Sequence, residues 1–75
     1  MKVGHKKYYI TIGKNLRDLR KDKGLSQQDL ANRCNIDRAK ISRIENATED
    51  FMLSTLIELT IALDVSLEKL FRTEK

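Results

Sequence analysis

The chain has 75 residues, a formal net charge of +4 at pH 7 and one cysteine. At this length we expect one domain that is only marginally stable alone, because so small a domain buries about 60% of its unfolded surface. The composition excludes an internal disulfide and a cysteine-rich metal cluster, and no run approaches the roughly 18 apolar residues of a membrane span.

Residues 1–10, MKVGHKKYYI, form the predicted N-terminal arm, which is basic and aromatic. Its lysines could contact DNA phosphates or a minor groove. Alternatively, Tyr8 and Tyr9 pack on the body of the domain, or the segment is a frayed terminus. Residues 1–24 carry eight Lys or Arg against two Asp, which predicts either a polyanionic partner or a solubilising face. His5 is the only histidine and predicts no metal site. The arm lacks the long apolar run of a secretory signal, so we expect a cytoplasmic protein.

A first helix is predicted over Ile12–Lys23, with Thr11 as its N-cap and Gly24 as the residue that ends it. Arg20 differs from the other basic residues of this helix, because it lies beside the apolar stripe. The residues with inward spacing are Ile12, Leu16 and Leu19, and those with outward spacing are Lys14, Arg17 and Lys21.

Residues 25–46, LSQQDLANRCNIDRAKISRIEN, predict two short helices joined by a tight turn. Ser26 is the expected N-cap of the first helix, and Asp29 is placed to bond back to it in a capping box. Asp37 is the expected N-cap of the second helix. Cys34 falls on the inner face of the first helix, which indicates a small core residue and not a reactive thiol.

The second helix of this pair has a narrow apolar stripe made of Ile41 and Ile44. At about 100° per residue, its opposite face is short, polar and basic. A helix of this shape suits the DNA major groove, where Arg reads guanine edges and small side chains allow a close approach. The residues predicted to read bases are Arg38, Ala39, Ser42 and Arg43.

This pattern resembles the helix-turn-helix of the Cro and phage-repressor (Xre-like) family. Ala31 stands where the family has a small residue at the helix crossing, and Ile41 and Ile44 follow where it has branched apolar residues. Asn35 replaces the usual turn glycine, and asparagine tolerates a left-handed backbone. The resemblance covers roughly residues 12–71 and implies an all-α, compact five-helix lambda-repressor-like domain.

The resemblance also implies roles for residues around the second helix of the motif. Arg20 and Glu45 are expected to form a partly buried ion pair through the fixed fork of arginine donors; the alternative is two solvated charges. Glu49 and Asp50 follow in a loop, and we expect them to turn aside from the DNA backbone. The residues expected against phosphate are Gln27, Lys40, Asn46, Lys14 and Arg17.

The last third of the chain predicts two further helices. The fourth is expected over roughly residues 54–63, capped by Ser54 or Thr55, and the fifth follows Ser66 as its N-cap. The inner stripe of the fourth helix is predicted to be Leu56, Leu59, Thr60 and Leu63. The expected core anchors in the preceding loop are Phe51 and Leu53. The residues that replace a usual family glycine are Ala47 and Asp64.

An i, i+4 apolar pair, Ile57 and Ile61, lies away from the inner stripe of the fourth helix. This pair predicts either a dimer interface or a surface covered by the N-terminal arm. A two-fold contact is self-complementary, so one such patch serves both subunits. The residues predicted at the dimer interface are Ile57, Ile61, Leu67 and Phe71.

The sequence therefore predicts a transcriptional regulator whose DNA-binding domain, residues 11–71, binds a palindromic operator as a homodimer, with residues 72–75 as a polar tail. Gln28 and Asn32 are neutral where some relatives carry activating acidic residues, which favours a repressor. The alternative is an antitoxin or protein-interaction adaptor. We expect no enzyme, because no catalytic constellation is present, and no cofactor, metal, small-molecule ligand or membrane partner.

Overall fold

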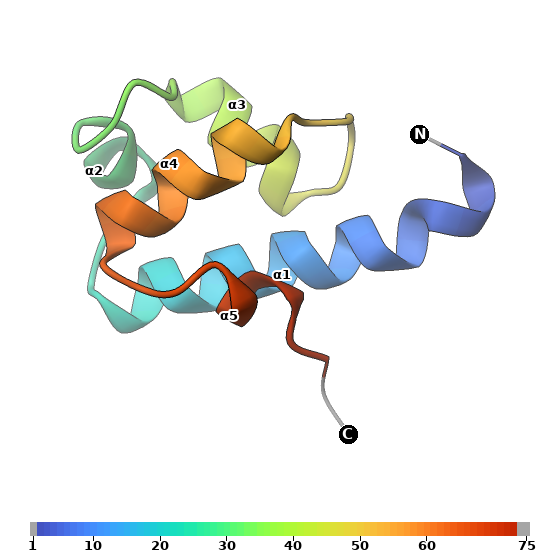
Figure 1. Ribbon diagram of the computed structural model, residues 1–75. Helices are drawn as coiled ribbons and strands as arrows, with labels where there is room; N and C mark the ends of the chain where they lie inside the picture. The colour runs from blue at the N-terminus through green and yellow to red at the C-terminus, as the bar shows by residue number, and fades with distance from the viewer. Residues whose placement is uncertain (1, 74–75) are drawn as a thin grey trace.

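The computed structural model describes residues 2–73 as five α-helices preceded by a short 3-10 turn (Figure 1). Residue 1 of the predicted arm and residues 74–75 of the predicted tail lie outside this range. The predicted all-α, five-helix fold is confirmed, with no strand between residues 2 and 73. The elements are the 3-10 turn Val3–His5, α1 Lys6–Asp22, α2 Gln27–Ala31, α3 Arg38–Glu45, α4 Leu53–Leu63 and α5 Glu68–Phe71.

The long helix α1 runs along one side of the molecule (Figure 1). Both α3 and α5 contact α1, while α2 contacts α3 and α4. The first turns of α1 extend past the body and lie beside the loop that joins α3 to α4 (Figure 1). This arrangement leaves one long side of α3 without a covering helix.

One hydrophobic core holds the helices together and takes at least one fully buried side chain from each. Burying a leucine or isoleucine contributes about 1.5–3 kcal/mol, so the core supplies most of the stabilisation. The inner stripe predicted for α4 is confirmed, since all four of its members are buried. The core side chains are Leu16, Leu30, Ile41, Ile44, Leu56, Leu59, Leu63 and Leu70.

Helix α1 begins at Lys6, so the start predicted at Ile12 is wrong. Thr11 is not an N-cap: it lies inside the helix, and its hydroxyl donates a hydrogen bond to the carbonyl of Lys7 at 3.0 Å. The boundary predicted between the arm and the domain therefore falls within a continuous helix. The predicted end is right, because α1 closes at Asp22 and Gly24 has a left-handed φ of 71°.

The N-caps predicted for α4 and α5 are also wrong. Met52 precedes α4 in an extended conformation, so Ser54 and Thr55 lie inside the helix. Leu67 precedes α5, so Ser66 lies one residue further out. Neither helix has a side-chain cap. Both are therefore held by the packing of their apolar faces.

The turns depart from the sequence prediction at specific residues. Helix α2 ends at Ala31, so Cys34 lies in the turn, half-buried against the core, and not on the inner face of the helix. Asn35 does not adopt a left-handed backbone: between residues 2 and 73, the non-glycine residues with positive φ are Ala47 at 56° and Asp64 at 57°. These are two positions where the family usually has glycine, so the chain bears some strain there.

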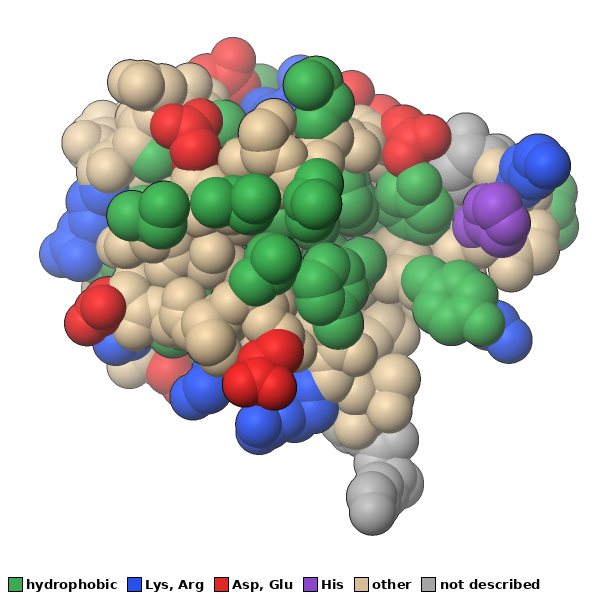
Figure 2. Space-filling view, in the orientation of Figure 1, with side chains coloured by type: hydrophobic (Ala, Val, Ile, Leu, Met, Phe, Trp, Pro, Cys, Tyr) green, Lys and Arg blue, Asp and Glu red, His purple; other side chains and the backbone are tan. Residues whose placement is uncertain are grey.

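An apolar band crosses the face formed by α4 and α5 (Figure 2). Leu53, predicted as a core anchor, is 57% exposed and contributes to this band, so that prediction is wrong. No helix within residues 2–73 is long and apolar enough to span a bilayer. The exposed members of the apolar band are Leu53, Ile57, Ile61 and Phe71.

Candidate nucleic-acid interface

The helix-turn-helix begins at a capping box that fixes the start of α2. The hydroxyl oxygen of Ser26 accepts a bond from the Asp29 backbone N–H at 2.9 Å, and the Asp29 carboxylate accepts one from the Ser26 N–H at 2.9 Å. Hydrogen bonding from Ser26 to the carboxylate, with its backbone N–H as the largest contribution, lowers the pKa of Asp29. Asp37 caps α3 by accepting the backbone N–H of Lys40 at 2.7 Å. The predicted caps of both helices are therefore confirmed.

Helix α3 buries one narrow side and leaves the other open. Ile41 and Ile44 are 0% exposed and hold the helix against the core. On the other side the predicted base-reading residues lie together on one helix: Arg38, Ala39 and Arg43 are exposed and Ser42 is half-buried. Short and basic side chains therefore project from α3 without a covering element.

The end of α3 gathers three of the residues predicted against phosphate. Arg17 of α1 donates from Nη2 to the Asn46 side-chain oxygen at 3.1 Å, and its Nε lies 3.5 Å from a carboxylate oxygen of Glu45. The Gln27 amide donates to the same Glu45 oxygen at 3.1 Å. These side chains already have partners inside the domain, so any phosphate contact must use their remaining donors.

Lys14, also predicted against phosphate, lies on a different side of α1. Its ammonium group is 3.0 Å from the Asp18 carboxylate, and it borders a hollow with Arg72 and Thr73 near the end of the described chain. Lys14 is therefore not brought together with the residues of α3.

Arg20 and Glu45 form an almost fully buried ion pair between α1 and α3. Arg20 donates from Nε to Glu45 at 2.7 Å and from Nη2 to the other carboxylate oxygen at 2.9 Å, and its Nη1 bonds the Leu25 carbonyl at 2.8 Å. The bonds to Glu45 raise the pKa of Arg20. Burial raises the pKa of Glu45, but the bonds and charges of its partners outweigh that effect and lower it. Both groups are therefore held in their charged forms.

The two acids of the α3–α4 loop behave differently. Asp50 turns away from α3 and accepts a hydrogen bond from the Tyr9 hydroxyl. Tyr9 also packs its ring on Phe51, with the ring centroids 5.0 Å apart. Glu49 does not turn aside as expected: it pairs with Arg43 and with Lys40, whose Nζ lies 3.4 Å from Glu49 Oε2.

Two structural features of this surface were absent from the sequence prediction. Gly13 lies where α1 crosses the end of α3, and a Cβ added there would come within 2.5 Å of the Ile44 carbonyl oxygen. A glycine inside a helical pattern is a signal of such close packing. The Glu49 pairing had no comparable signal, because it depends on the path of an irregular loop.

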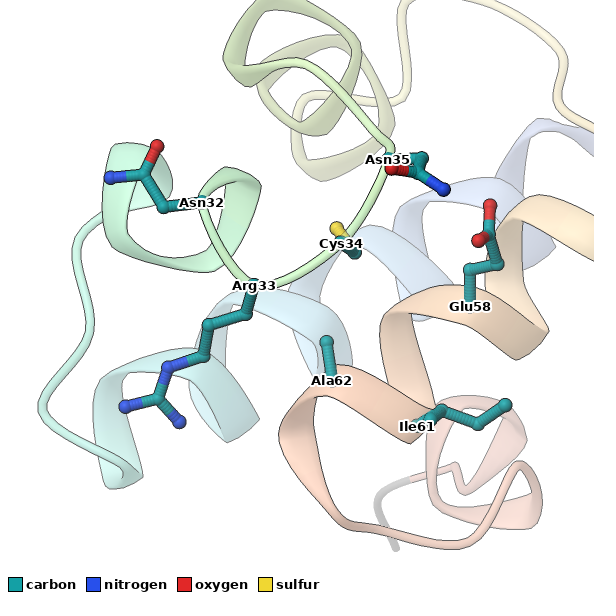
Figure 3. A pocket seen from close by; sticks show the side chains of 7 residues that line it. All are labelled: Asn32, Arg33, Cys34, Asn35, Glu58, Ile61 and Ala62. Carbon is teal, nitrogen blue, oxygen red and sulfur yellow. The ribbon is translucent and has the colours of Figure 1, made fainter.

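A hollow of about 360 Å³ lies between the turn of the motif and α4 (Figure 3). Its thiol, Cys34, is directed at its own chain, with Sγ 3.4 Å from the Leu30 carbonyl oxygen. Arg33 extends away from α4 (Figure 3). Within the described part of the chain, no group of three or more His, Cys, Asp or Glu is placed to hold a metal ion. The hollow is lined by Asn32, Arg33, Cys34, Asn35, Glu58, Ile61 and Ala62.

Known proteins share this sequence pattern over most of the chain. Residues 16–70 match the helix-turn-helix family model HTH_3. The control protein C.MunI from a Mycoplasma species is 36% identical over 63 residues, which cover 83% of this chain and 85% of that protein. A hypothetical transcription factor from Neisseria meningitidis serogroup B is 36% identical over 52 residues, covering 69% of this chain, which spans 49% of the Neisseria protein.

Solved structures share the fold. The restriction-modification controller protein C.AhdI from Aeromonas hydrophila has 34% identity and a TM-score of 0.85, covering 89% of this chain and 97% of that one. The controller protein C.Esp1396I, as a tetramer in complex with its natural 35 base-pair operator, has 25% identity and a TM-score of 0.75, covering 87% of this chain and 96% of that one. The chain belongs to the Xre/Cro-like helix-turn-helix family.

Proposed function

We propose that this protein is a sequence-specific DNA-binding transcriptional regulator that inserts α3 into the major groove. The observation that carries the proposal is the division of α3 into two faces: Ile41 and Ile44 are fully buried, while Arg38 and Arg43 are exposed. Arginine reads guanine edges in the major groove through paired donors. Ala39 between them lets the helix approach the bases closely.

The residues beside α3 supply the proposed backbone contacts. Lys40 lies on α3, while Gln27, Arg17 and Asn46 surround Glu45 at its base. Phosphate contacts fix the register of a protein on the duplex, and base contacts provide the discrimination. We assign the phosphate contacts to these four side chains and the base contacts to the exposed face of α3.

The regulator is proposed to bind a palindromic operator as a homodimer and to repress. A single recognition helix reads few base pairs, whereas a two-fold dimer reads two half-sites about 34 Å apart. The exposed apolar band on α4 and α5 supports the dimer. The neutral residues Gln28 and Asn32 on α2 and its C-terminal end support repression over activation.

The names of two relatives favour one class of target. C.MunI is named a control protein, and C.AhdI is named a restriction-modification controller. We propose the promoter of a restriction–modification system as the first target to test. Transcription from promoters beside the coding sequence, measured with and without the protein, would show which genes respond.

The proposed recognition predicts different results for base-reading and phosphate-binding variants. After selection of a preferred duplex from a random pool, Arg38→Ala or Arg43→Ala should cost about 1–3 kcal/mol on that duplex and relax preference at particular base pairs. Arg17→Ala should weaken binding to matched and mismatched duplexes by the same factor. Binding isotherms on both duplexes measure this. If the α3 variants lose the same binding free energy on both duplexes, the assignment of base reading to α3 is wrong.

A further inference from the structure

The carboxylate of Glu49 folds back from the α3–α4 loop onto the exposed face of α3. One oxygen, Oε1, accepts a hydrogen bond from Arg43 Nε, and the other, Oε2, lies 3.4 Å from Lys40 Nζ. Glu49 is itself half-buried. An acidic side chain thus lies in a face that has to approach a polyanion, which costs binding energy unless the carboxylate has a compensating role.

The contact uses a particular edge of Arg43. The guanidinium group has five N–H donors, and only Nε is bonded to Glu49. Among the residues that the structure describes, none takes a hydrogen bond from the two terminal nitrogens of Arg43. Those two nitrogens form a planar fork that matches guanine O6 and N7. The carboxylate therefore holds the guanidinium from behind and leaves the reading edge open.

The loop that carries Glu49 is itself anchored on both sides. The Thr48 backbone N–H bonds the Arg43 carbonyl at 3.0 Å, which ties the loop to the same residue that Glu49 contacts. On the other side, Asp50 accepts a hydrogen bond from the Tyr9 hydroxyl, and Phe51 packs on the Tyr9 ring. Because its neighbours on each side are fixed, the backbone of Glu49 is held in place, and its side chain extends from a fixed position beside Arg43.

We propose that Glu49 is a positioning residue for DNA recognition: it orients Arg43 for one guanine and at the same time weakens binding to DNA of any sequence through its charge. Fixing a flexible arginine in its reading orientation reduces the entropy lost on binding the correct base. The negative charge opposes the phosphates equally on all duplexes. The orientation effect increases discrimination, whereas the charge lowers the affinity for all duplexes and leaves their ratio unchanged. This inference rests on the proposed function of α3.

Three variants separate orientation from charge. Glu49→Gln removes the charge and keeps the side-chain length, and Glu49→Asp keeps the charge but shortens the side chain. Asp50→Asn removes a neighbouring charge that does not contact Arg43, and the asparagine side-chain oxygen can still accept the Tyr9 hydroxyl that anchors the loop. Each is measured on the selected duplex and on single-base-pair variants of it, with circular dichroism as a check of folding. The readout is the ratio of the dissociation constant for each variant duplex to the dissociation constant for the selected duplex.

Glu49→Gln and Asp50→Asn should both tighten binding to all duplexes. Only the Glu49 variants should lower the ratio, by about three- to tenfold at one base pair. This loss is a part of the discrimination that a bidentate arginine provides. In an Arg43→Ala background, Glu49→Gln should leave the ratio unchanged. If Glu49→Gln tightens all duplexes equally and the ratio holds, the inference is wrong while the proposed function stands. If the wild-type protein selects no duplex, the proposed function itself fails.

Discussion

The Glu45 carboxylate accepts more hydrogen bonds than any neighbouring acid in the described chain. Glu45 is 4% exposed and accepts bonds from Arg20 and Gln27, with Arg17 nearby. No buried side-chain nitrogen or oxygen within residues 2–73 lacks a hydrogen-bond partner. A carboxylate in this setting is stable only while its partners remain, because a buried charge without a partner loses its solvation without compensation.

We therefore expect Arg20 and Glu45 to act as one structural unit. Arg20→Leu and Glu45→Leu should each lower the free energy of unfolding by about 3 kcal/mol, because each removes the main partner of the other buried charge. The double variant should lose less than the sum of the two single losses. Denaturant unfolding of the four proteins measures the coupling. A coupling energy near zero would mean that both charges are solvated in solution.

Asp64 has a strained, left-handed backbone, with φ at 57° just after α4. Asp64→Gly should raise the free energy of unfolding by about 1 kcal/mol, because glycine adopts this conformation without a Cβ clash. Asp64 is exposed, so the substitution loses no core contact. Asp64→Ala retains the Cβ and serves as the control. Equal thermal unfolding midpoints for the glycine and alanine variants would contradict the strain argument.

Residue-scale predictions from the sequence succeeded where the signal was local or periodic. The caps at Ser26 and Asp37 follow from side-chain chemistry within one turn. The pairing of Glu49 with Arg43 was not predictable, because the segment between them includes the left-handed residue Ala47. The direction of a chain after such a residue depends on packing that the sequence does not encode locally.

At the scale of whole elements, α1 and α3 are in close contact where they cross at Gly13. A Cβ placed on Gly13 would lie 2.5 Å from the Ile44 carbonyl oxygen and 2.7 Å from that of Glu45. Real side chains do not approach backbone so closely, so any larger residue must push the two helices apart. The C-terminal end of α3 thus lies directly against the backbone of α1.

Gly13→Ala is expected to destabilise the domain by about 1–3 kcal/mol, the usual cost of overpacking. The loss should exceed the gain of about 1 kcal/mol that alanine brings to a helix interior. Gly4→Ala is the matched control, because a Cβ there meets nothing within 4 Å. Thermal unfolding of both variants gives the comparison. If Gly13→Ala is as stable as the wild type, the helices tolerate a wider crossing than we infer.

The sequence predicted the number of helices and their inner stripes, but it misplaced the start of α1 and the N-caps of α4 and α5. Thr11 has the chemistry of an N-cap, yet its hydroxyl bonds the Lys7 carbonyl four residues earlier, within the helix. A threonine makes either bond, and the choice depends on whether the preceding residues are helical. Here Tyr9 packs on Phe51, a contact distant in sequence that accompanies the early start of α1.

At the scale of the whole molecule, the apolar band on α4 and α5 lies apart from the exposed face of α3. The alternative cover for it, the N-terminal segment, is engaged elsewhere: Tyr9 contacts Asp50 and Phe51, and Tyr8 is 58% exposed. Ile61 is 73% exposed, an unusual environment for so large an apolar side chain. We propose that a second copy of the chain covers this band, because a two-fold contact needs only one such patch.

The proposed interface predicts that Ile61→Glu gives a folded monomer with much weaker binding to the selected duplex. A charge in the centre of a two-fold interface meets its symmetry mate, whereas on an exposed helix face it leaves the fold intact. Sedimentation gives the oligomeric state, and circular dichroism reports the fold. Val3→Glu is the control, since Val3 is 94% exposed and lies outside the band. A variant that unfolds would indicate that the band is covered within one chain, and a wild-type protein that stays monomeric at high micromolar concentration, free and on DNA, would refute the dimer.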